Sequence, residues 1–158
     1  MLIAFFDIDG LVHHAYVPRG QTVNKELYKT VQQHLRDAVC RHRPEKWRSG
    51  NWILHHDNAP AHRALTTNEF LAKHNILSLP HPPYSFDLAP CDFFLFPQLK
   101  KTMKSRRFDY VEELEANATR QLRAITKSDY QRCFRPWQEC WNKCIQVQGH
   151  YFDGDKTN

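Results

Sequence analysis

Two aspartates, Asp57 and Asp92, stand at places in the sequence where a carboxylate could hold a metal ion. Asp57 ends a short apolar run at 52–56, and a proline follows three residues later. Asp92 follows a proline-rich loop and precedes the apolar residues 93–96. A carboxylate at the end of a strand and another at the start of a helix can converge on Mg²⁺, which prefers oxygen ligands. Such a pair favours phosphoryl-transfer chemistry on nucleic acid.

Each aspartate also has an ordinary structural interpretation. Asp57 could cap the turn that leads to Pro60, and Asp92 could simply interact with the dipole of the helix that it begins. Histidines and cysteines occur nearby, but none of them shows the compact spacing of zinc ligands, so packed or solvated side chains are the better interpretation.

The elements that must position these carboxylates alternate between strands and helices. Two strand-like runs, 2–8 and 11–17, flank Asp9-Gly10, which is typical of a hairpin turn. Apolar steps of three and four predict a helix that begins after Asn24, its N-cap. The sequence then predicts a strand, a helix and a strand, at 52–56, 61–74 and 76–79.

The remainder is predicted to be helical. One helix is expected after the proline-rich loop, with the place of Pro97 within it left open. Asp109 and Glu112 are expected to form a capping box, and Ser128 is expected to cap the last helix. The elements together predict the α/β class, with a mixed sheet flanked by helices.

Composition limits the domain count and the class of partner. The chain has 158 residues, which suits one domain, placed at 1–148 with a polar tail at 149–158. Lys and Arg number 22 against 17 Asp and Glu, a basic balance that is compatible with nucleic acid. The five cysteines form no regular framework, which favours reduced thiols in an intracellular protein, and no apolar run is long enough to span a membrane.

Two long segments, 55–62 and 79–96, resemble the catalytic region of mariner-type (Tc1/mariner) DNA transposases. They read HHDNAPAH and LPHPPYSFDLAPCDFFLF. The 34 residues between Asp57 and Asp92 match that family's spacing between its second and third catalytic carboxylates. The resemblance implies an RNase H-like fold and DNA strand cleavage and transfer with Mg²⁺ or Mn²⁺, for which Asp57 and Asp92 would be catalytic metal ligands.

The resemblance also bears on partners and location. It implies DNA as the partner, a nuclear location, and a homodimer as a state that the family adopts. With it, the densest basic cluster is expected to contact DNA phosphates rather than to be only a solvated helix end. This basic cluster consists of Lys100, Lys101, Lys104, Arg106 and Arg107.

The chain departs from the family pattern at its start and in one loop. The family's first catalytic Asp lies on a strand upstream of the hairpin, and no residue here matches it. Asp7 aligns with the following strand, so we interpret it as structural. Phe86 stands where the family usually has proline, which removes a backbone restraint.

These departures limit the expected activity. We expect the chain to be incomplete at its N-terminus, without the strand that is central in an RNase H-like sheet. Its absence should either expose two strand edges or force a rearranged pairing. We expect no transposition by the chain alone, although two carboxylates could still bind one Mg²⁺. A domesticated, non-catalytic DNA-binding module and a decayed transposon product are the alternatives.

Overall fold

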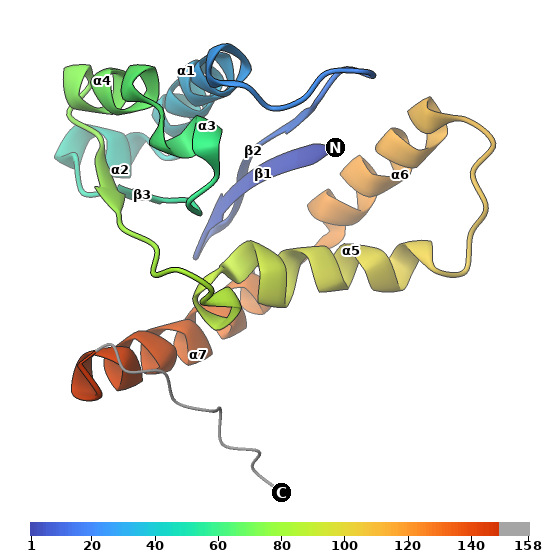
Figure 1. Cartoon of the computed structure of the whole chain (residues 1–158). Helices are drawn as coiled ribbons and strands as arrows, with labels where there is room; N and C mark the ends of the chain where they lie inside the picture. Colours follow the sequence, from blue (N-terminus) through green and yellow to red (C-terminus); the bar gives the residue numbers. More distant parts are fainter. Residues whose placement is uncertain (149–158) are drawn as a thin grey trace, which may run out of the picture.

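The computed structural model describes residues 1–148, so the predicted polar tail lies outside the described residues (Figure 1). The elements follow one another as β1 (Leu2–Asp7), β2 (Gly10–Tyr16), α1 (Lys25–His42), α2 (Pro44–Ser49), β3 (Ile53–His55), α3 (Pro60–Arg63), α4 (Leu65–Lys73), β4 (Leu77–Leu79), the short turns η1 (Phe86–Leu88) and η2 (Cys91–Leu95), α5 (Phe96–Met103), α6 (Val111–Ala124) and α7 (Lys127–Gln146). No helix in this described part is long and apolar enough to cross a membrane.

The first two strands form the predicted antiparallel hairpin, with its turn one residue earlier than expected. Asp7 pairs with Gly10, so Ile8 and Asp9 are the two loop residues. The Asp7 carboxylate accepts a hydrogen bond from the Asp9 N–H (2.9 Å), which closes the turn locally. Gly10 begins β2 with a φ of 127°, a conformation that an L side chain rarely adopts.

The mixed α/β class is confirmed, but within residues 1–148 the four strands form two small sheets rather than one. β1 pairs with β2 in antiparallel fashion, and β3 pairs with β4 in parallel fashion. The strands β1 and β3 are not paired with each other. Among the described residues, β1 and β3 therefore each keep one edge without a strand partner, so of the two expected outcomes the structure has unpaired edges rather than a rearranged pairing.

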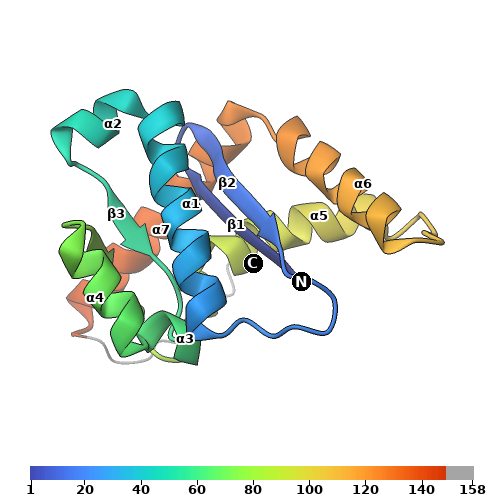
Figure 2. The ribbon, with the colours of Figure 1, turned by 90° about the horizontal axis from the view of Figure 1, so that it is seen from above.

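Each sheet has its own hydrophobic cluster, and the helices divide between them. Helices α1 to α4 lie on one side of the strands, and α5, α6 and α7 lie on the other (Figures 1 and 2). The hairpin cluster packs β1 against α5, α6 and α7, and consists of Ala4, Leu95, Leu99, Leu122 and Tyr130. The β3 cluster packs β3 against α1 and α4, and consists of Leu35, Val39, Leu54, Phe70 and Leu71.

The helix starts agree only in part with the predicted caps. Asn24 caps α1 as expected, accepting from the Leu27 N–H at 2.8 Å. The last helix is capped by Thr126 rather than by Ser128, because the Thr126 side chain and Asp129 bond reciprocally in a capping box. The capping box predicted at the start of α6 is absent, since that helix begins after Tyr110 with no side-chain cap.

Three helical segments also differ from the expected pattern. The helix predicted at 61–74 is split by Ala64, whose ψ of 145° is extended and separates α3 from α4. Pro44 ends α1 and also begins α2, a short helix that the sequence did not predict. After Pro90 one continuous helical run begins as a π-turn, and Pro97 lies in the first α-helical turn, where its missing N–H costs little.

Candidate metal and DNA site

Asp57 lies just beyond the end of β3, and its carboxylate is already engaged. Its side chain is 59% exposed and forms an ion pair with His62, Nδ1 to Oδ1, at 2.6 Å. The same oxygen accepts a hydrogen bond from the Ala59 N–H at 3.0 Å. The bond from His62 lowers the pKa of Asp57 to about 2, against the smaller effect of burial. Asp57 therefore caps the turn before α3, and its carboxylate is ionised at neutral pH.

His62 is held by two further aromatic residues. Its ring stacks on His56, with centroids 5.0 Å apart and planes 6° apart. His56 Nδ1 in turn is 2.8 Å from the hydroxyl of Tyr28, a fully buried residue of α1. Burial, followed by the nearby His62, lowers the pKa of His56 to about 4, so this imidazole is neutral at pH 7. The Asp57 turn is thus fastened to α1 through His62 and His56.

Asp92 has a different environment. It occupies the first turn of η2, and its backbone N–H bonds to the Ala89 carbonyl at 2.9 Å. Its side chain is exposed and makes no hydrogen bond or ion pair with any residue in 1–148. The turn is anchored three residues later by Leu95, which is fully buried in the hairpin cluster. Asp92 therefore offers a free carboxylate on a rigid element, as a metal ligand requires.

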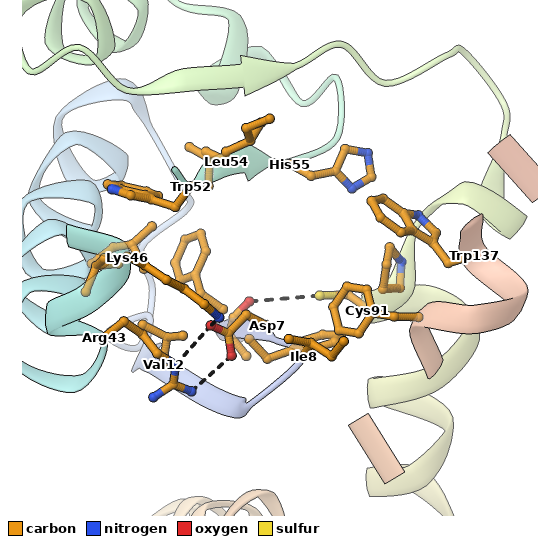
Figure 3. Close-up of a pocket in the computed structure, with 18 of the residues that line it drawn as sticks. Asp7, Ile8, Val12, Arg43, Lys46, Trp52, Leu54, His55, Cys91 and Trp137 are labelled. Carbon is orange, nitrogen blue, oxygen red and sulfur yellow. Dashed lines mark hydrogen bonds and ion pairs between the residues drawn. The ribbon is translucent and has the colours of Figure 1, made fainter. Parts of the chain in front are cut away.

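Asp92 directly follows Cys91, a partly buried cysteine whose thiol lies 3.9 Å from the Ala4 carbonyl oxygen (Figure 3). Burial raises the pKa of Cys91 to about 12, and the negative charges of Asp92 and of Asp57 add to the effect. Yet within the described residues no group of three or more His, Cys, Asp or Glu side chains could hold a metal ion. The two oxygen donors suit a Mg²⁺ ion that keeps most of its waters, not a closed protein cage.

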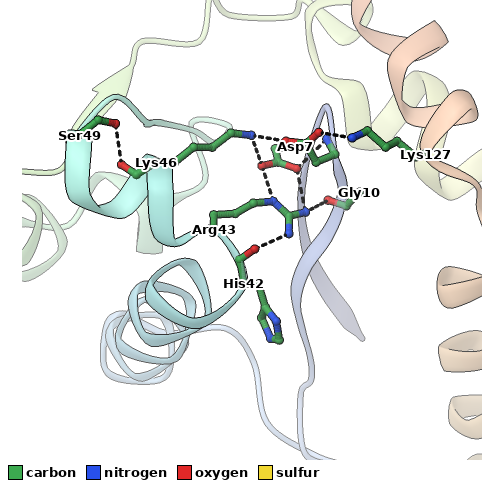
Figure 4. Close-up of polar contacts among 8 residues, drawn as sticks. Asp7, Gly10, His42, Arg43, Lys46, Ser49 and Lys127 are labelled. Atoms are coloured by element: carbon green, nitrogen blue, oxygen red, sulfur yellow. Dashed lines mark hydrogen bonds and ion pairs between the residues drawn. The ribbon is translucent and has the colours of Figure 1, made fainter.

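Asp7, at the end of β1, is a further acidic residue, but both of its carboxylate oxygens already accept hydrogen bonds from basic side chains (Figure 4). Arg43 donates to both carboxylate oxygens, from Nε at 2.9 Å and from Nη2 at 3.0 Å. Lys46 Nζ adds a bond at 2.7 Å and also reaches Asp9 at 2.8 Å. Burial raises the pKa of Asp7, but the bonds from Arg43 and Lys46 outweigh it and leave the pKa below its ordinary value. Asp7 is a structural anion, as its sequence position indicated.

All five residues of the basic cluster are exposed. Lys100 and Lys101 lie on α5, in the same continuous helical run as Asp92, so about 12 Å of helix separates Asp92 from Lys100. Arg106 follows that helix and donates to the Asn117 amide oxygen of α6 at 3.3 Å. Within residues 1–148, the side chains of the other four make no hydrogen bond or ion pair, so their charges are free for phosphate. The cluster therefore extends away from Asp92 along α5 and into the segment that follows it.

Sequence reasoning missed the contact between His62 and Asp57. The histidines near Asp57 were interpreted as packed or solvated, and His56 is indeed packed. The signal for His62 was its position five residues after Asp57, on the first turn that follows Pro60. That spacing places the imidazole over the preceding loop only if the helix starts at Pro60. The structure has this start, whereas the sequence pattern predicted a start at residue 61.

Comparison with known proteins places this geometry in a family. Residues 21–115, more than half of the chain, match the family described as DDE superfamily endonuclease. The mariner Mos1 transposase of Drosophila mauritiana is 34% identical over 154 residues, which are 97% of this chain and 45% of that protein. The chain belongs to the DDE superfamily of endonucleases. The family resemblance read from the two motif segments is thus confirmed.

Solved structures of this family share the fold. The Mos1 transposase catalytic domain, determined with Raltegravir and Mg, has a TM-score of 0.87 at 33% identity and covers 96% of this chain and 76% of that one. The histone-lysine N-methyltransferase SETMAR of Homo sapiens is 29% identical over 154 residues, 97% of this chain and 22% of SETMAR. The chain therefore spans less than half the length of the curated relatives that it matches.

Proposed function

We propose that this chain binds DNA and holds a divalent cation, Mg²⁺ or Mn²⁺, at Asp57 and Asp92, in a site of the kind that cleaves and transfers DNA strands. We propose further that the chain alone does not complete that reaction, because the described residues supply only two carboxylates to the site. The observation that carries the proposal is the free, exposed carboxylate of Asp92 on a helical turn anchored by Leu95, within the segment 21–115 that also holds Asp57 and matches the DDE superfamily endonucleases. In support, the Mos1 catalytic domain has been solved with Mg and with Mn.

Each side chain has a defined part in this proposal. Asp92 is free to bind a cation directly, whereas Asp57 must exchange its bond with His62 for one to the metal. A divalent cation bound there would polarise the scissile phosphate and activate a water or hydroxyl nucleophile. The protein's own contribution is to keep the Asp57 carboxylate ionised and to hold Asp92 on a turn that is anchored in the hairpin cluster.

DNA binding is the second part of the proposal. Mos1 has been solved as a paired-end complex with the left transposon end. In this chain, the exposed basic cluster begins on the helix that carries Asp92, so a DNA backbone lying along α5 would reach the two carboxylates. Neutralising phosphates with lysine and arginine releases counterions, so we expect binding to weaken steeply with salt.

The first experiment measures metal binding and plasmid nicking by the purified chain in Mg²⁺ and in Mn²⁺. Asp57→Ala and Asp92→Ala are compared with Asp87→Ala, an exposed aspartate on η1. We expect Mn²⁺ binding that is lost in the first two variants and kept in the third, with no nicking by any of them. Nicking by the parent chain that the first two substitutions abolish would refute the proposed inactivity, and unchanged Mn²⁺ binding in both would refute the metal site.

The second experiment measures the affinity for duplex DNA as a function of salt. Substituting Lys100, Lys101 and Lys104 by Gln should weaken binding and reduce the slope of log affinity against log salt concentration. The slope should fall by about one for each phosphate that is no longer neutralised. The matched control substitutes Lys25, Lys29 and Lys73, which are exposed on α1 and α4. If DNA binding survives the loss of both carboxylates and the parent chain binds no metal, the non-catalytic module would be favoured. An equal effect of the two lysine sets would contradict the proposed DNA surface.

A further inference from the structure

A groove of about 490 Å³ lies beside β2, where the hairpin meets three helices. Its walls are residues 9–14 of the hairpin, the end of α1 at His42, and residues 122–130, where α6 ends and α7 begins. We call it the β2 groove. None of its walls belongs to the segments that carry Asp57, Asp92 or the basic cluster, so it is separate from the candidate metal and DNA site.

Within residues 1–148, the β2 wall of this groove has backbone groups that no strand pairs. β2 pairs with β1 alone there, so its other edge has no strand partner. Val17 donates its N–H to the Met1 carbonyl at 2.9 Å, and bonded and non-bonded pairs alternate along an antiparallel ladder. His14, three residues before Val17, therefore directs its backbone N–H away from β1. Val12 is skipped in the pairing, a bulge that leaves this residue outside the ladder.

The side chains around the β2 groove carry an excess of positive charge. Asp9 lies in the wall, but it is already paired with Lys127 at 2.9 Å and with Lys46 at 2.8 Å. These two lysines reach the hairpin turn from opposite sides (Figure 4). The side chains of Arg123, in the last turn of α6, and of His42 are exposed and make no hydrogen bond or ion pair with any residue in 1–148. The groove therefore has basic groups that no carboxylate of the described chain neutralises.

Two histidines of β2 respond to this excess charge. Burial lowers the pKa of His13, and so do its basic neighbours, which are His34, His14, Arg41 and His42. Burial and then Arg123 lower the pKa of His14. In addition, the His13 Nε2 atom is buried and has no hydrogen-bond partner among residues 1–148, which costs free energy. An anion in the groove would oppose the part of both pKa shifts that comes from the neighbouring charges.

The donors around the groove select the kind of anion. Guanidinium, ammonium and backbone N–H groups are the donors that bind phosphate oxygens in proteins. Here they come from different elements and surround the groove, which suits a tetrahedral phosphate better than a planar carboxylate. The groove is also larger than one phosphate group, since pockets of this volume bind whole small molecules. The geometry therefore favours a ligand with two or more linked phosphates.

We propose that the β2 groove binds linked phosphate groups through Arg123, Lys127 and the backbone N–H of His14. When Lys127 turns to the phosphate, Lys46 keeps Asp9 paired. A nucleic-acid backbone and free pyrophosphate share this chemistry. If the source is DNA, the chain contacts DNA at a second surface. The proposal depends neither on a bound metal nor on the basic cluster, so it can succeed or fail without them.

The first test titrates inorganic pyrophosphate into the full chain in EDTA, followed by calorimetry. We expect saturable binding that Arg123→Gln weakens about five- to tenfold, because charge-assisted hydrogen bonds are lost. Arg135→Gln removes the same charge from an exposed position of α7 outside the groove and should leave the affinity unchanged. Substituting Lys100, Lys101 and Lys104 by Gln should also leave it unchanged. Circular dichroism confirms that each variant is folded.

A spectroscopic readout follows the His14 imidazole by NMR during a pH titration. The probe is sulfate, an oxyanion whose charge stays constant over the titration. Sulfate should raise the pKa of His14 in the parent chain, and it should raise it less in Arg123→Gln. Arg123→Gln without sulfate should also raise this pKa, because Arg123 lowers it. A purely structural role of Arg123 would give no sulfate-dependent shift.

A duplex DNA titration of the same variants distinguishes the two sources. If Arg123→Gln weakens the binding of pyrophosphate and of DNA, the source is the nucleic-acid backbone. If it weakens pyrophosphate binding alone, the source is a free phosphate compound, and the DNA surface of the proposed function is judged by the three lysines only.

Three results would overturn the proposal. The first is no saturable pyrophosphate binding by the parent chain. The second is an equal loss of affinity in Arg123→Gln and Arg135→Gln, which would mean that only net charge matters. The third is loss of pyrophosphate binding on substitution of the three lysines, which would assign the anion to the basic cluster. A chain that binds pyrophosphate in the groove but no DNA would refute the proposed DNA surface and keep this site.

Discussion

Replacing Asp7 by asparagine should destabilise the protein without affecting metal binding. Asp7 accepts three charge-assisted hydrogen bonds, two from Arg43 and one from Lys46, at 2.7 to 3.0 Å. Bonds of this class contribute about 1.5–3 kcal/mol each when shielded. Here the side chains of Asp7 and Lys46 are 26% and 33% exposed, so water screens part of that contribution. Asparagine keeps one acceptor but removes the charge, and we expect a loss of about 2–3 kcal/mol.

The assay is thermal and urea unfolding, followed by circular dichroism. For a domain of this size the loss corresponds to a fall in Tm of roughly 4–12 °C. Asp9→Asn is the matched control, because Asp9 lies in the same hairpin and bonds only to lysines, with a side chain that is 35% exposed. Its effect should stay below about 1 kcal/mol. If Asp7→Asn kept the parent Tm but lost Mn²⁺ affinity, Asp7 would be a metal ligand, and its structural assignment would be wrong.

Three further predictions concern acid stability, the Asp57 turn and the last helix. Because folding lowers the pKa of Asp7 below its unfolded value of 3.8, the ionised carboxylate stabilises the fold above that value, and this stabilisation is lost as the pH falls through the pKa of the folded state. The difference in urea midpoint between the parent and Asp7→Asn should therefore shrink below about pH 4. His62→Ala frees the Asp57 carboxylate and should tighten Mn²⁺ binding, by calorimetry, about three- to tenfold; unchanged affinity would contradict Asp57 as a ligand. Thr126→Ala should cost about 1 kcal/mol in urea unfolding, and Ser128→Ala little; equal effects would contradict the assigned cap.

Features that depend on near neighbours in the chain could be predicted from the sequence. Asn24 caps α1 through a bond to a residue three positions later, and the hairpin follows from two strand-like runs around one glycine. Thr126 and Ser128 are both good cap residues, and only the reciprocal bond with Asp129 decides between them. The split at Ala64 carries no glycine or proline signal, so periodicity alone merged α3 with α4.

Features that depend on distant contacts could not be read in this way. Asp57 and Asp92 were recognised from motif segments, yet nothing in those segments showed that one carboxylate is bonded to an imidazole and the other is free. The pairing of Asp7 with Arg43 and Lys46 joins residues that are 36 and 39 positions apart in the chain. A salt bridge between elements leaves no periodic trace, because either partner is also an ordinary surface residue.

The Asp7 ion pairs add a polar connection between the hairpin and the β3 side, where Phe5 and Val12 of the hairpin already pack against the β3 cluster. The hairpin cluster organises β1 with α5 to α7, while the β3 cluster organises β3 with α1 and α4, and no strand pairing joins the two. Arg43 and Lys46 belong to the α1–α2 corner on the β3 side, so their bonds to Asp7 connect the end of β1 to that side. The loss of these bonds in Asp7→Asn should therefore weaken the connection at the Asp7 end of β1, while the apolar contacts of Phe5 and Val12 with the β3 cluster remain.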